Sequence, residues 1–434
     1  MNAGLSCSEH QRLKILVEPG CFDCLNLGDV AMLEVLVDRL FELWPNATIQ
    51  VLTDAPERLL GSCPRAEPID ALGRRIWFQD GCLFSPLHRL LPERLSLRLL
   101  TTESALRRRW PSQVETLLRL KTKLLRRDSE SLIRFLRAVR EADLIVVSGQ
   151  GSINDTFYAQ GLNVLDVLGM AIRNGTPTAL FGQGLGPMCN PRLRARAKQV
   201  LPNVNLLALR EGRAAQQLLD SLSISLSTMM VTGDDAIELA YNLRPRGLGN
   251  GIGVNLRVAT YSQMNSTHLQ TIGSVLRKAA SNHGAPMVPV AIAIGDQISD
   301  ANTIRQLIYG HEPSPLCEDK PDAPEKVILQ IGGCHIVVAG SYHAAVFAMA
   351  QGIPTICLAN SAYYFDKFFG LADQFGTGCK VIRADDAGLS QKLEDAIEDA
   401  WSSAEGVRPS LLAAAVRQIE ASRAAYHTLY RQLS

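Results

Sequence analysis

A histidine at the start of a predicted helix is the first residue in this chain that could do chemistry. His343 follows the apolar run His335–Ala339, which predicts a buried strand, and a break at Gly340 and Ser341. Ser341 is a fair N-cap for a helix over residues 342–351. Open α/β sheets bind ligands where strands end and helices begin, and histidine titrates near neutral pH. We therefore expect His343 to act as a general acid or base, in preference to a half-buried histidine bonded to backbone.

Cationic residues follow other predicted strands and could hold an anion beside this histidine. Arg210 directly follows a buried apolar run, and Lys367 lies on the next strand-to-helix connection after His343. Arg257 ends the first strand of a second α/β pattern, together with Asn255. Because the carboxyl ends of parallel strands share one edge of a sheet, we expect these side chains near the same ligand.

Glycine-rich turns supply a second anion-binding feature. They include Gly149 and Gly151 after one predicted strand, and Gln183 and Gly184 after the next. Glycine lets backbone N–H groups approach an anion, although it also serves tight turns. Three such connections on one edge, with Arg210 ending the third, predict an anion site.

One further glycine lies at the mouth of the first helix, which the apolar spacing predicts to begin at Asp29 or Val30. Gly28 and Asp29 could meet a ligand there. Alternatively, Asp29 only balances the helix dipole.

Alternating strand and helix patterns divide the chain into two Rossmann-like α/β domains, over residues 1–245 and 246–405. Two further amphipathic helices are predicted over Gln391–Trp401 and Pro409–Leu433, and residues 406–434 could pack back on the first domain. Facing sheet edges imply an interdomain cleft. The first loop lacks the G-x-G-x-x-G pattern, so nothing specifies a dinucleotide.

A basic, leucine-rich stretch over about 83–140 interrupts the first domain. It holds 14 Lys and Arg against five acids, a balance of +9. Arg107–Arg109 with Trp110, and the run Lys121–Arg127, resemble parts of a membrane-surface helix. A solvated helical insertion is the alternative. Nucleic-acid binding is disfavoured, because no stacking aromatics interleave the basic residues.

The whole chain has ordinary globular composition: 434 residues, 47% hydrophobic, 20% charged and a net charge of +1. No apolar run is long enough to span a bilayer, and the first residues do not resemble a signal peptide. We expect a cytoplasmic protein whose basic insertion could reach the inner face of the membrane. Ten scattered cysteines fit reduced thiols.

No metal site is predicted. Cys21 and Cys24 form a lone C-x-x-C, which favours a loop over zinc or redox chemistry. Asp234 and Asp235 point to opposite faces of a strand and lack a third ligand, so an N-cap role for one of them is preferred.

The motifs taken together resemble the polysaccharide pyruvyl transferase family. The matching segments are Asn26–Asp29, Ser148–Ser152, Gly182–Pro187, Leu209–Glu211, Gly233–Ala236, Ser341–His343, Phe347–Ala348 and Gly352–Pro354. They extend over about residues 14–400 and keep a consistent order and spacing.

This resemblance implies two Rossmann-like domains in a glycosyltransferase-B-like arrangement. It also implies transfer of a pyruvyl group from phosphoenolpyruvate to a sugar diol, which forms a ketal on a saccharide or a lipid-linked saccharide acceptor. Phosphoenolpyruvate is then a co-substrate, and no further cofactor is expected. Arg210 would hold the donor's phosphate or carboxylate, His343 would be the central polar residue, and Lys367 a second anion contact.

One position departs from the family. Members often carry an arginine two residues before this histidine, where this chain has Ser341. A bidentate anion contact is therefore missing. Either Arg257 replaces it from the facing strand, or the donor differs.

Two other functions remain open. A nucleotide-sugar glycosyltransferase could use the same fold, but Glu318 and Glu325 are seven positions apart and not the eight common in retaining members. The sequence also has no P-loop, which argues against an ATPase. A non-catalytic sugar- or anion-binding relative is the second alternative, and Ser341 is its best support.

Overall fold

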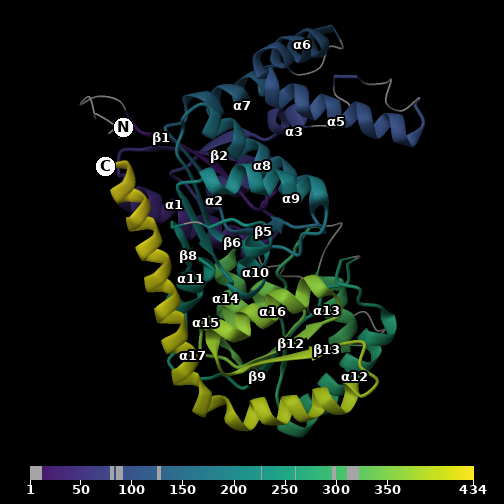
Figure 1. Cartoon of the computed structure of the whole chain (residues 1–434). Coiled ribbons are helices and arrows are strands. Elements are labelled where there is room, and N and C mark those ends of the chain that lie inside the picture. The colour runs from purple at the N-terminus through teal and green to yellow at the C-terminus, as the bar shows by residue number, and fades with distance from the viewer. Residues whose placement is uncertain are drawn as a thin grey trace.

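The protein consists of two parallel α/β domains, one above the other in Figure 1. The computed structural model describes residues 12–78, 83–84, 91–124, 129–225, 227–259, 261–295, 300–309 and 322–434. Parts of the basic insertion (85–90 and 125–128) and the Pro-rich loop with Glu318 lie outside these residues. The prediction of two parallel α/β sheets is confirmed.

The first sheet has the strand order β3-β2-β1-β4-β6-β7-β8, and β5 pairs with β6 off this path. Every pairing between these strands is parallel. The strands are β1 Lys14–Glu18, β2 Thr48–Thr53, β3 Glu67–Asp70, β4 Leu144–Val147, β5 Gln150–Ile153, β6 Thr178–Leu185, β7 Leu206–Leu209 and β8 Met229–Val231. Their apolar runs, such as LIVV in β4, are buried, as expected for a sheet covered on both faces.

Two predicted glycine loops are strands in the structure. The predicted strand ending at Phe181 continues as β6 to Leu185, and residues 150–153 form β5 beside it. The apolar pattern could not reveal this, because glycine and glutamine interrupt it while the neighbouring backbone still pairs with them.

Helices cover both faces of this sheet. They are α1 Leu27–Leu43, α2 Pro56–Ser62, α3 Leu72–Phe78, α5 Glu93–Arg109, α6 Pro111–Leu124, α7 Glu130–Glu141, α8 Tyr158–Arg173, α9 Pro191–Val200, α10 Arg213–Ser221 and α11 Ala236–Asn242, with a 3₁₀ turn at Leu201–Asn203. Helix α1 begins two residues earlier than the first predicted start. The Asn26 side chain caps it by accepting from the Gly28 N–H. Asp29 therefore lies within the first turn.

The second sheet has the order β10-β9-β11-β12-β13, again with parallel pairings. Its strands are β9 Gly251–Asn255, β10 Met287–Pro289, β11 Cys334–Ala339, β12 Thr355–Ala359 and β13 Cys379–Arg383, and its helices are α12 Ser266–His283, α13 Asp300–Tyr309, α14 Pro324–Gly332, α15 Tyr342–Ala350 and α16 Ala362–Phe375. All nine residues of α15 are buried, which explains why its sequence is apolar on every side.

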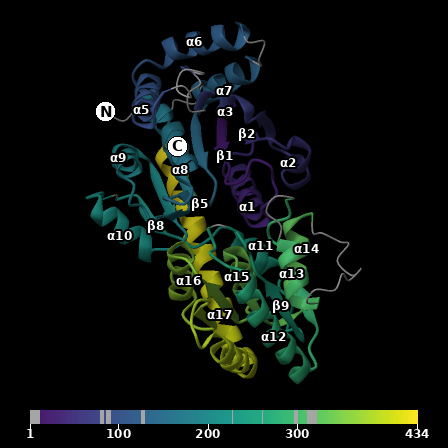
Figure 2. The same cartoon turned by 90° about the vertical axis from the view of Figure 1, so that its right-hand side faces the viewer.

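A single long helix, α17 (Leu389–Leu433), ends the chain, where two helices were predicted. Pro409 lies inside it. Proline removes one helical hydrogen bond, so it can bend a helix without ending it when packing holds both sides. Figures 1 and 2 show α17 bending beneath the second domain and then running along both domains. In the first domain, Tyr426 stacks on Phe181 with ring centroids 3.7 Å apart.

One apolar core crosses the domain boundary. Leu27 and Met32 of α1 and Ala236 of α11 belong to the same buried cluster as α15 residues such as Val346 and Phe347. This continuous core holds the facing sheet edges in a defined relation. None of the described helices combines the length and apolar character needed to cross a bilayer.

Candidate active site

A cavity of about 190 Å³ lies where the two sheets face each other. Both domains contribute to its lining. The first supplies the α1 start, β5 and the end of β7, and the second supplies the starts of α15 and α16. The predicted site residues that line it are Asp29, Gly151, Arg210, Arg257, Ser341, His343 and Lys367. Tertiary structure thus brings residues that are far apart in the sequence to one small space.

His343 lies between the two domains, in the first turn of α15. Its Nε2 atom is 3.5 Å from Oδ2 of Asp234, which follows β8 in the first domain. Asp234 is also 3.6 Å from Nη1 of Arg210. Burial alone would raise the pKa of Asp234, but His343 and Arg210 outweigh burial, and the pKa lies below its usual value. A buried carboxylate is therefore available to stabilise positive charge on the imidazole.

Gly28 makes room for this histidine. A Cβ atom at position 28 would lie 2.0 Å from both Cγ and Nδ1 of His343. The glycine is thus required by close packing of α1 against the imidazole, and it needs no contact with ligand. The adjacent Asp29 lines the cavity, and burial raises its pKa despite nearby His343 and Arg210.

Arg210 is buried, with 1% of its surface exposed. Its Nε donates to Glu211 at 2.9 Å, and its guanidinium lies 4.2 Å from the ring centroid of Tyr342. Within the described part of the chain, its Nη2 atom has no hydrogen-bond partner. A Cβ atom on Gly151 would lie 2.6 Å from this nitrogen. The unpaired Nη2 group of Arg210 therefore lies beside Gly151 of β5, which lines the cavity.

Lys367 reaches the same place from α16. Its Nζ would lie 2.7 Å from a Cβ on Gly151, and it donates to the Tyr363 hydroxyl, which lies 3.4 Å from the Gly151 carbonyl oxygen. Burial, followed by the charge of Arg210, holds the pKa of Lys367 well below its usual value. Two basic side chains, Arg210 and Lys367, therefore converge on the same point of the buried cavity.

Arg257 lines the cavity but is already paired. Its Nε and Nη2 atoms donate to the two carboxylate oxygens of Asp300 at 2.8 and 3.0 Å. Asn255 donates to the same carboxylate and to the Val290 carbonyl oxygen. Asn255 therefore orients Asp300 and lies outside the cavity lining. Arg257 approaches from the facing strand with its charge largely balanced.

Most of the remaining predicted residues do not line the cavity but contact residues next to it. Gly149 packs against the Met32 side chain, and Gly184 packs against Arg210 and Glu211. Gln183 is fully buried and donates to the carbonyls of Ser148 and Phe181, so it ties β6 to the end of β4. Ser341 occupies the N-cap position of α15, but its hydroxyl does not cap the helix, and its Oγ has no partner among the described residues.

An aromatic wall completes the cavity. It consists of Phe157, which precedes α8, Tyr261, which follows β9, and Tyr363 and Tyr364 of α16. Phe157 and Tyr261 have ring centroids 5.5 Å apart, and Tyr261 stacks on Tyr364 at 6.2 Å. Sequence analysis missed this wall, because its members are far apart along the chain and each resembles an ordinary core aromatic.

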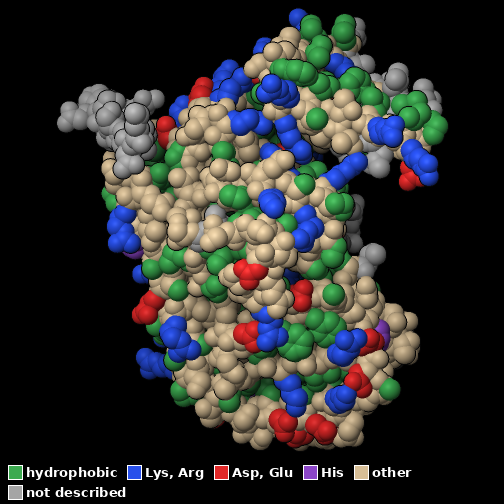
Figure 3. Space-filling view, in the orientation of Figure 1, with side chains coloured by type: hydrophobic (Ala, Val, Ile, Leu, Met, Phe, Trp, Pro, Cys, Tyr) green, Lys and Arg blue, Asp and Glu red, His purple; other side chains and the backbone are tan. Residues whose placement is uncertain are grey.

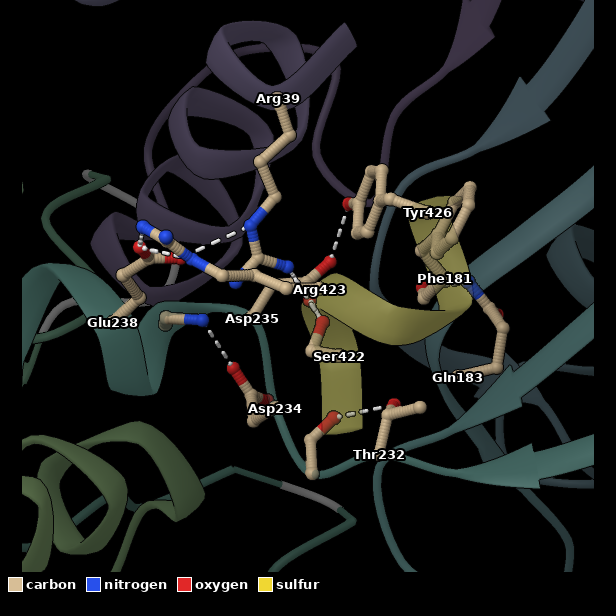
Figure 4. Close-up of polar contacts among 12 residues, drawn as sticks. Arg39, Phe181, Gln183, Thr232, Asp234, Asp235, Glu238, Ser422, Arg423 and Tyr426 are labelled. Carbon is tan, nitrogen blue, oxygen red and sulfur yellow. Dashed lines mark hydrogen bonds and ion pairs between the residues drawn. The ribbon is translucent and has the colours of Figure 1, made fainter. Parts of the chain in front are cut away.

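A network of hydrogen bonds holds Asp235, and this fixes the position of the adjacent Asp234 (Figure 4). Asp235 accepts from Arg39 of α1 at 3.1 Å, and from Ser422 and Tyr426 of α17. Asp234 itself accepts from the Ala236 N–H at 2.9 Å, which is the helix-start role preferred for one of the two aspartates. The two carboxylates therefore point in different directions, one to α17 and one to His343.

The fold and cavity together define a two-domain α/β protein of the glycosyltransferase-B type with an interdomain site. A putative UDP-N-acetylglucosamine 2-epimerase from Listeria monocytogenes is similar, with a TM-score of 0.55 at 11% identity over 95% of this chain and 94% of that one. The Neisseria meningitidis UDP-GlcNAc 2-epimerase bound to UDP-GlcNAc has a TM-score of 0.54 at 12% identity, over 96% and 100% of the two chains. A glycosyltransferase from Rickettsia africae has a TM-score of 0.51 at 10% identity, over 98% and 99%. At such identities the likeness concerns the fold.

The sequence carries the more specific signal. A model of the polysaccharide pyruvyl transferase family matches residues 26–362, and the chain belongs to that family. The matched range includes His343 and Arg210 and ends just before Lys367. No curated protein matches the chain in sequence. Family membership indicates a transferase that acts on a polysaccharide.

Proposed function

We propose that this protein transfers a pyruvyl group from phosphoenolpyruvate to two hydroxyls of a saccharide and forms a ketal. The observation that carries the proposal is the convergence of Arg210 Nη2 and Lys367 Nζ on Gly151, beside His343. Phosphoenolpyruvate carries a phosphate and a carboxylate, and both require cations in a buried site. Arg257 would contact the second anionic group from the facing strand.

The reaction needs proton transfer and charge stabilisation, and the cavity has groups for both. A proton adds to C3 of the enol, a sugar hydroxyl oxygen bonds to C2, and the C2–O bond to phosphate breaks. A second hydroxyl oxygen then bonds to C2 and closes the ring. Of the two hydroxyl protons released, one replaces the proton added to C3 and one goes to the departing phosphate. His343 acts as the acid and base, a role worth about 10²–10⁴-fold in rate.

Positive charge develops on C2 while the phosphate leaves as an anion. Arg210 and Lys367 stabilise the leaving phosphate, because they are fixed in position before the reaction begins. Asp234 stabilises the imidazole of His343 when it holds a proton. The lowered pKa of Lys367 fits this task, since a bound phosphate restores the charged amine.

The aromatic wall supports a saccharide as acceptor. Phe157 and Tyr261 are half-buried and line the cavity, so their rings are accessible to a ligand. The less polar face of a sugar ring packs well against such rings. The orphan atoms Ser341 Oγ and Gln150 Nε2 lie in the same lining and supply donors for sugar hydroxyls. In this role Ser341, which replaces the arginine common in the family, serves the acceptor.

Two variants separate donor binding from chemistry. Gly151→Ala places a methyl group where the phosphate would lie, so phosphoenolpyruvate affinity measured by calorimetry should fall by at least about tenfold. His343→Gln should leave that affinity nearly unchanged but abolish phosphate release with a panel of saccharide diols. Equal donor affinity in wild type and Gly151→Ala would contradict the assigned anion site.

The same measurements distinguish the other two functions. Stabilisation by UDP-sugars in a thermal-shift panel, with none by phosphoenolpyruvate, would identify a glycosyltransferase. Phosphoenolpyruvate binding without phosphate release from any saccharide in the panel would identify a binding protein.

A further inference from the structure

Helices α5 and α6 lie at the end of the first domain that is away from the second domain (Figure 1). Their apolar side chains line a groove. The groove has a volume of about 730 Å³. Its lining includes Leu106 of α5, Trp110 between the two helices, and Leu117, Leu120 and Leu124 of α6. None of the groove residues belongs to the cavity around His343.

The groove exposes unusually large apolar side chains. Trp110 is 51% exposed, Leu117 56%, Leu120 55% and Leu124 82%. Isolated exposed leucines are ordinary, but a contiguous group marks an interaction site. The three leucines follow one another at helical spacing and form one stripe of α6.

This stripe is not the one that attaches α6 to the domain. Val114 and Leu118 are buried and belong to the core cluster of Phe135 and Trp77. Helix α6 thus has one apolar stripe packed on the domain and a second one open beside the first. Among the described residues, no buried cluster includes the three leucines of the open stripe.

Basic side chains lie next to the groove residues along the two helices. Arg109, Arg119 and Lys123 are exposed. Arg119 is 52% exposed and lies 3.8 Å from Glu115, which Arg140 also holds, so this contact neutralises little of its charge. The segment 83–140 carries +9 of charge, in a chain whose total is +1. Figure 3 shows hydrophobic and basic side chains side by side over this end of the molecule.

We propose that the groove face of α5 and α6 docks on an anionic lipid bilayer. Apolar side chains with a tryptophan enter the interface, while lysines and arginines contact anionic headgroups. A second copy of the chain fits less well, because two faces of the same positive charge repel each other. The proposal does not depend on the pyruvyl transfer, since no groove residue touches the catalytic cavity.

Docking would hold the enzyme at the surface without burying its site. The cavity lies between the domains, and the groove lies at the far end of the first domain (Figure 1). The face would therefore raise the local concentration of enzyme near membrane-bound acceptors and leave turnover of water-soluble substrates unchanged.

Vesicle sedimentation tests the proposal. The full chain should sediment with vesicles of phosphatidylcholine and phosphatidylglycerol, bind far less to phosphatidylcholine alone, and dissociate as salt rises. Leu117→Gln with Leu120→Gln should lower the affinity by at least about tenfold. Leu329→Gln is the matched control, because Leu329 is 57% exposed on the second domain. It should bind like wild type.

A second pair of variants tests the charges. Arg119→Glu with Lys123→Glu should lower affinity for anionic vesicles by about tenfold or more and leave binding to neutral vesicles unchanged. The exposed Lys198 and Arg417, reversed to Glu together, serve as the control. Trp110 fluorescence should shift to shorter wavelength on binding, and Trp110→Phe should remove that shift.

Several outcomes would overturn the proposal. The first is that wild type does not bind anionic vesicles. The second is that the control variants lose as much affinity for vesicles as the groove variants. The third is that Trp110 emission does not shift when the protein binds vesicles. Self-association that disappears in Leu117→Gln with Leu120→Gln, without vesicle binding, would assign the groove to a second copy. Thermal unfolding of each variant, with a midpoint near that of wild type, shows that the fold is intact.

Discussion

His343 Nε2 lies 3.5 Å from Asp234 Oδ2, although the two residues belong to different domains. The contact joins the start of α15 to the loop after β8, so the imidazole is oriented by the facing domain. Asp234 in turn is placed beside Asp235, which α1 and α17 hold. Correct assembly of both domains is therefore a condition for an oriented histidine.

Asp234→Asn is expected to lower kcat by about tenfold or more, within the range that acid–base assistance contributes. The neutral amide keeps the shape but no longer stabilises positive charge on His343. The loss should fall on kcat, with the affinity for phosphoenolpyruvate nearly unchanged in calorimetry. A kcat equal to that of wild type would show that Asp234 does not assist the histidine.

Gly28→Ala is expected to impair turnover without unfolding the protein. The new Cβ would lie 2.0 Å from the His343 ring, so the ring must move. Turnover should fall by about 10²-fold if the acid–base role is lost. Gly61→Ala in α2 is the control, since its Cβ meets nothing within 4 Å. That variant should keep full activity and gain up to about 1 kcal/mol of stability.

Lys367→Met is expected to be more stable than wild type near neutral pH. Burial and Arg210 lower the pKa of Lys367 in the folded state, whereas the unfolded chain keeps a value near 10.4. Between these two values unfolding takes up a proton, so the lysine destabilises the fold increasingly as pH falls. The difference in free energy of unfolding between Lys367→Met and wild type, measured by denaturant unfolding, should become smaller as pH rises toward about 10.

The same lysine predicts proton uptake on donor binding. A bound phosphate favours the charged amine, so phosphoenolpyruvate should bind more tightly as pH falls toward the folded pKa of Lys367. Calorimetry in buffers of different ionisation enthalpy measures this uptake. Lys367→Met should reduce it, and identical uptake in both proteins would assign the proton to another group.

Arg39→Met is expected to destabilise the protein by about 3 kcal/mol or more, because Asp235 and Glu238 lose a buried partner. Arg423 pairs with the same Glu238 but is 55% exposed. Arg423→Met should therefore cost about 1 kcal/mol or less. Comparable losses in the two variants, measured by denaturant unfolding, would show that burial does not control this network.

Most of the strands and helices could be predicted from the order of the amino acids alone. Apolar runs such as that of β4 and the stretch before Ser341 are strong signals, because buried parallel strands need continuous apolar residues. The position of His343 at the start of a helix followed from the same local pattern. The family resemblance also depended only on local motifs and their order, and the family model confirms it.

The contacts of these residues could not be predicted, because they depend on how distant segments pack together. Asp234 meets His343, and Phe157 meets Tyr261 and Tyr363, across long sequence separations that no local pattern records. The continuity of α17 through Pro409 depends on packing against both domains, and packing overrides a local helix-breaking signal. Gly28 shows the same contrast: the sequence places a glycine at a helix start, and the fold reveals that His343 fills the space where a Cβ would lie.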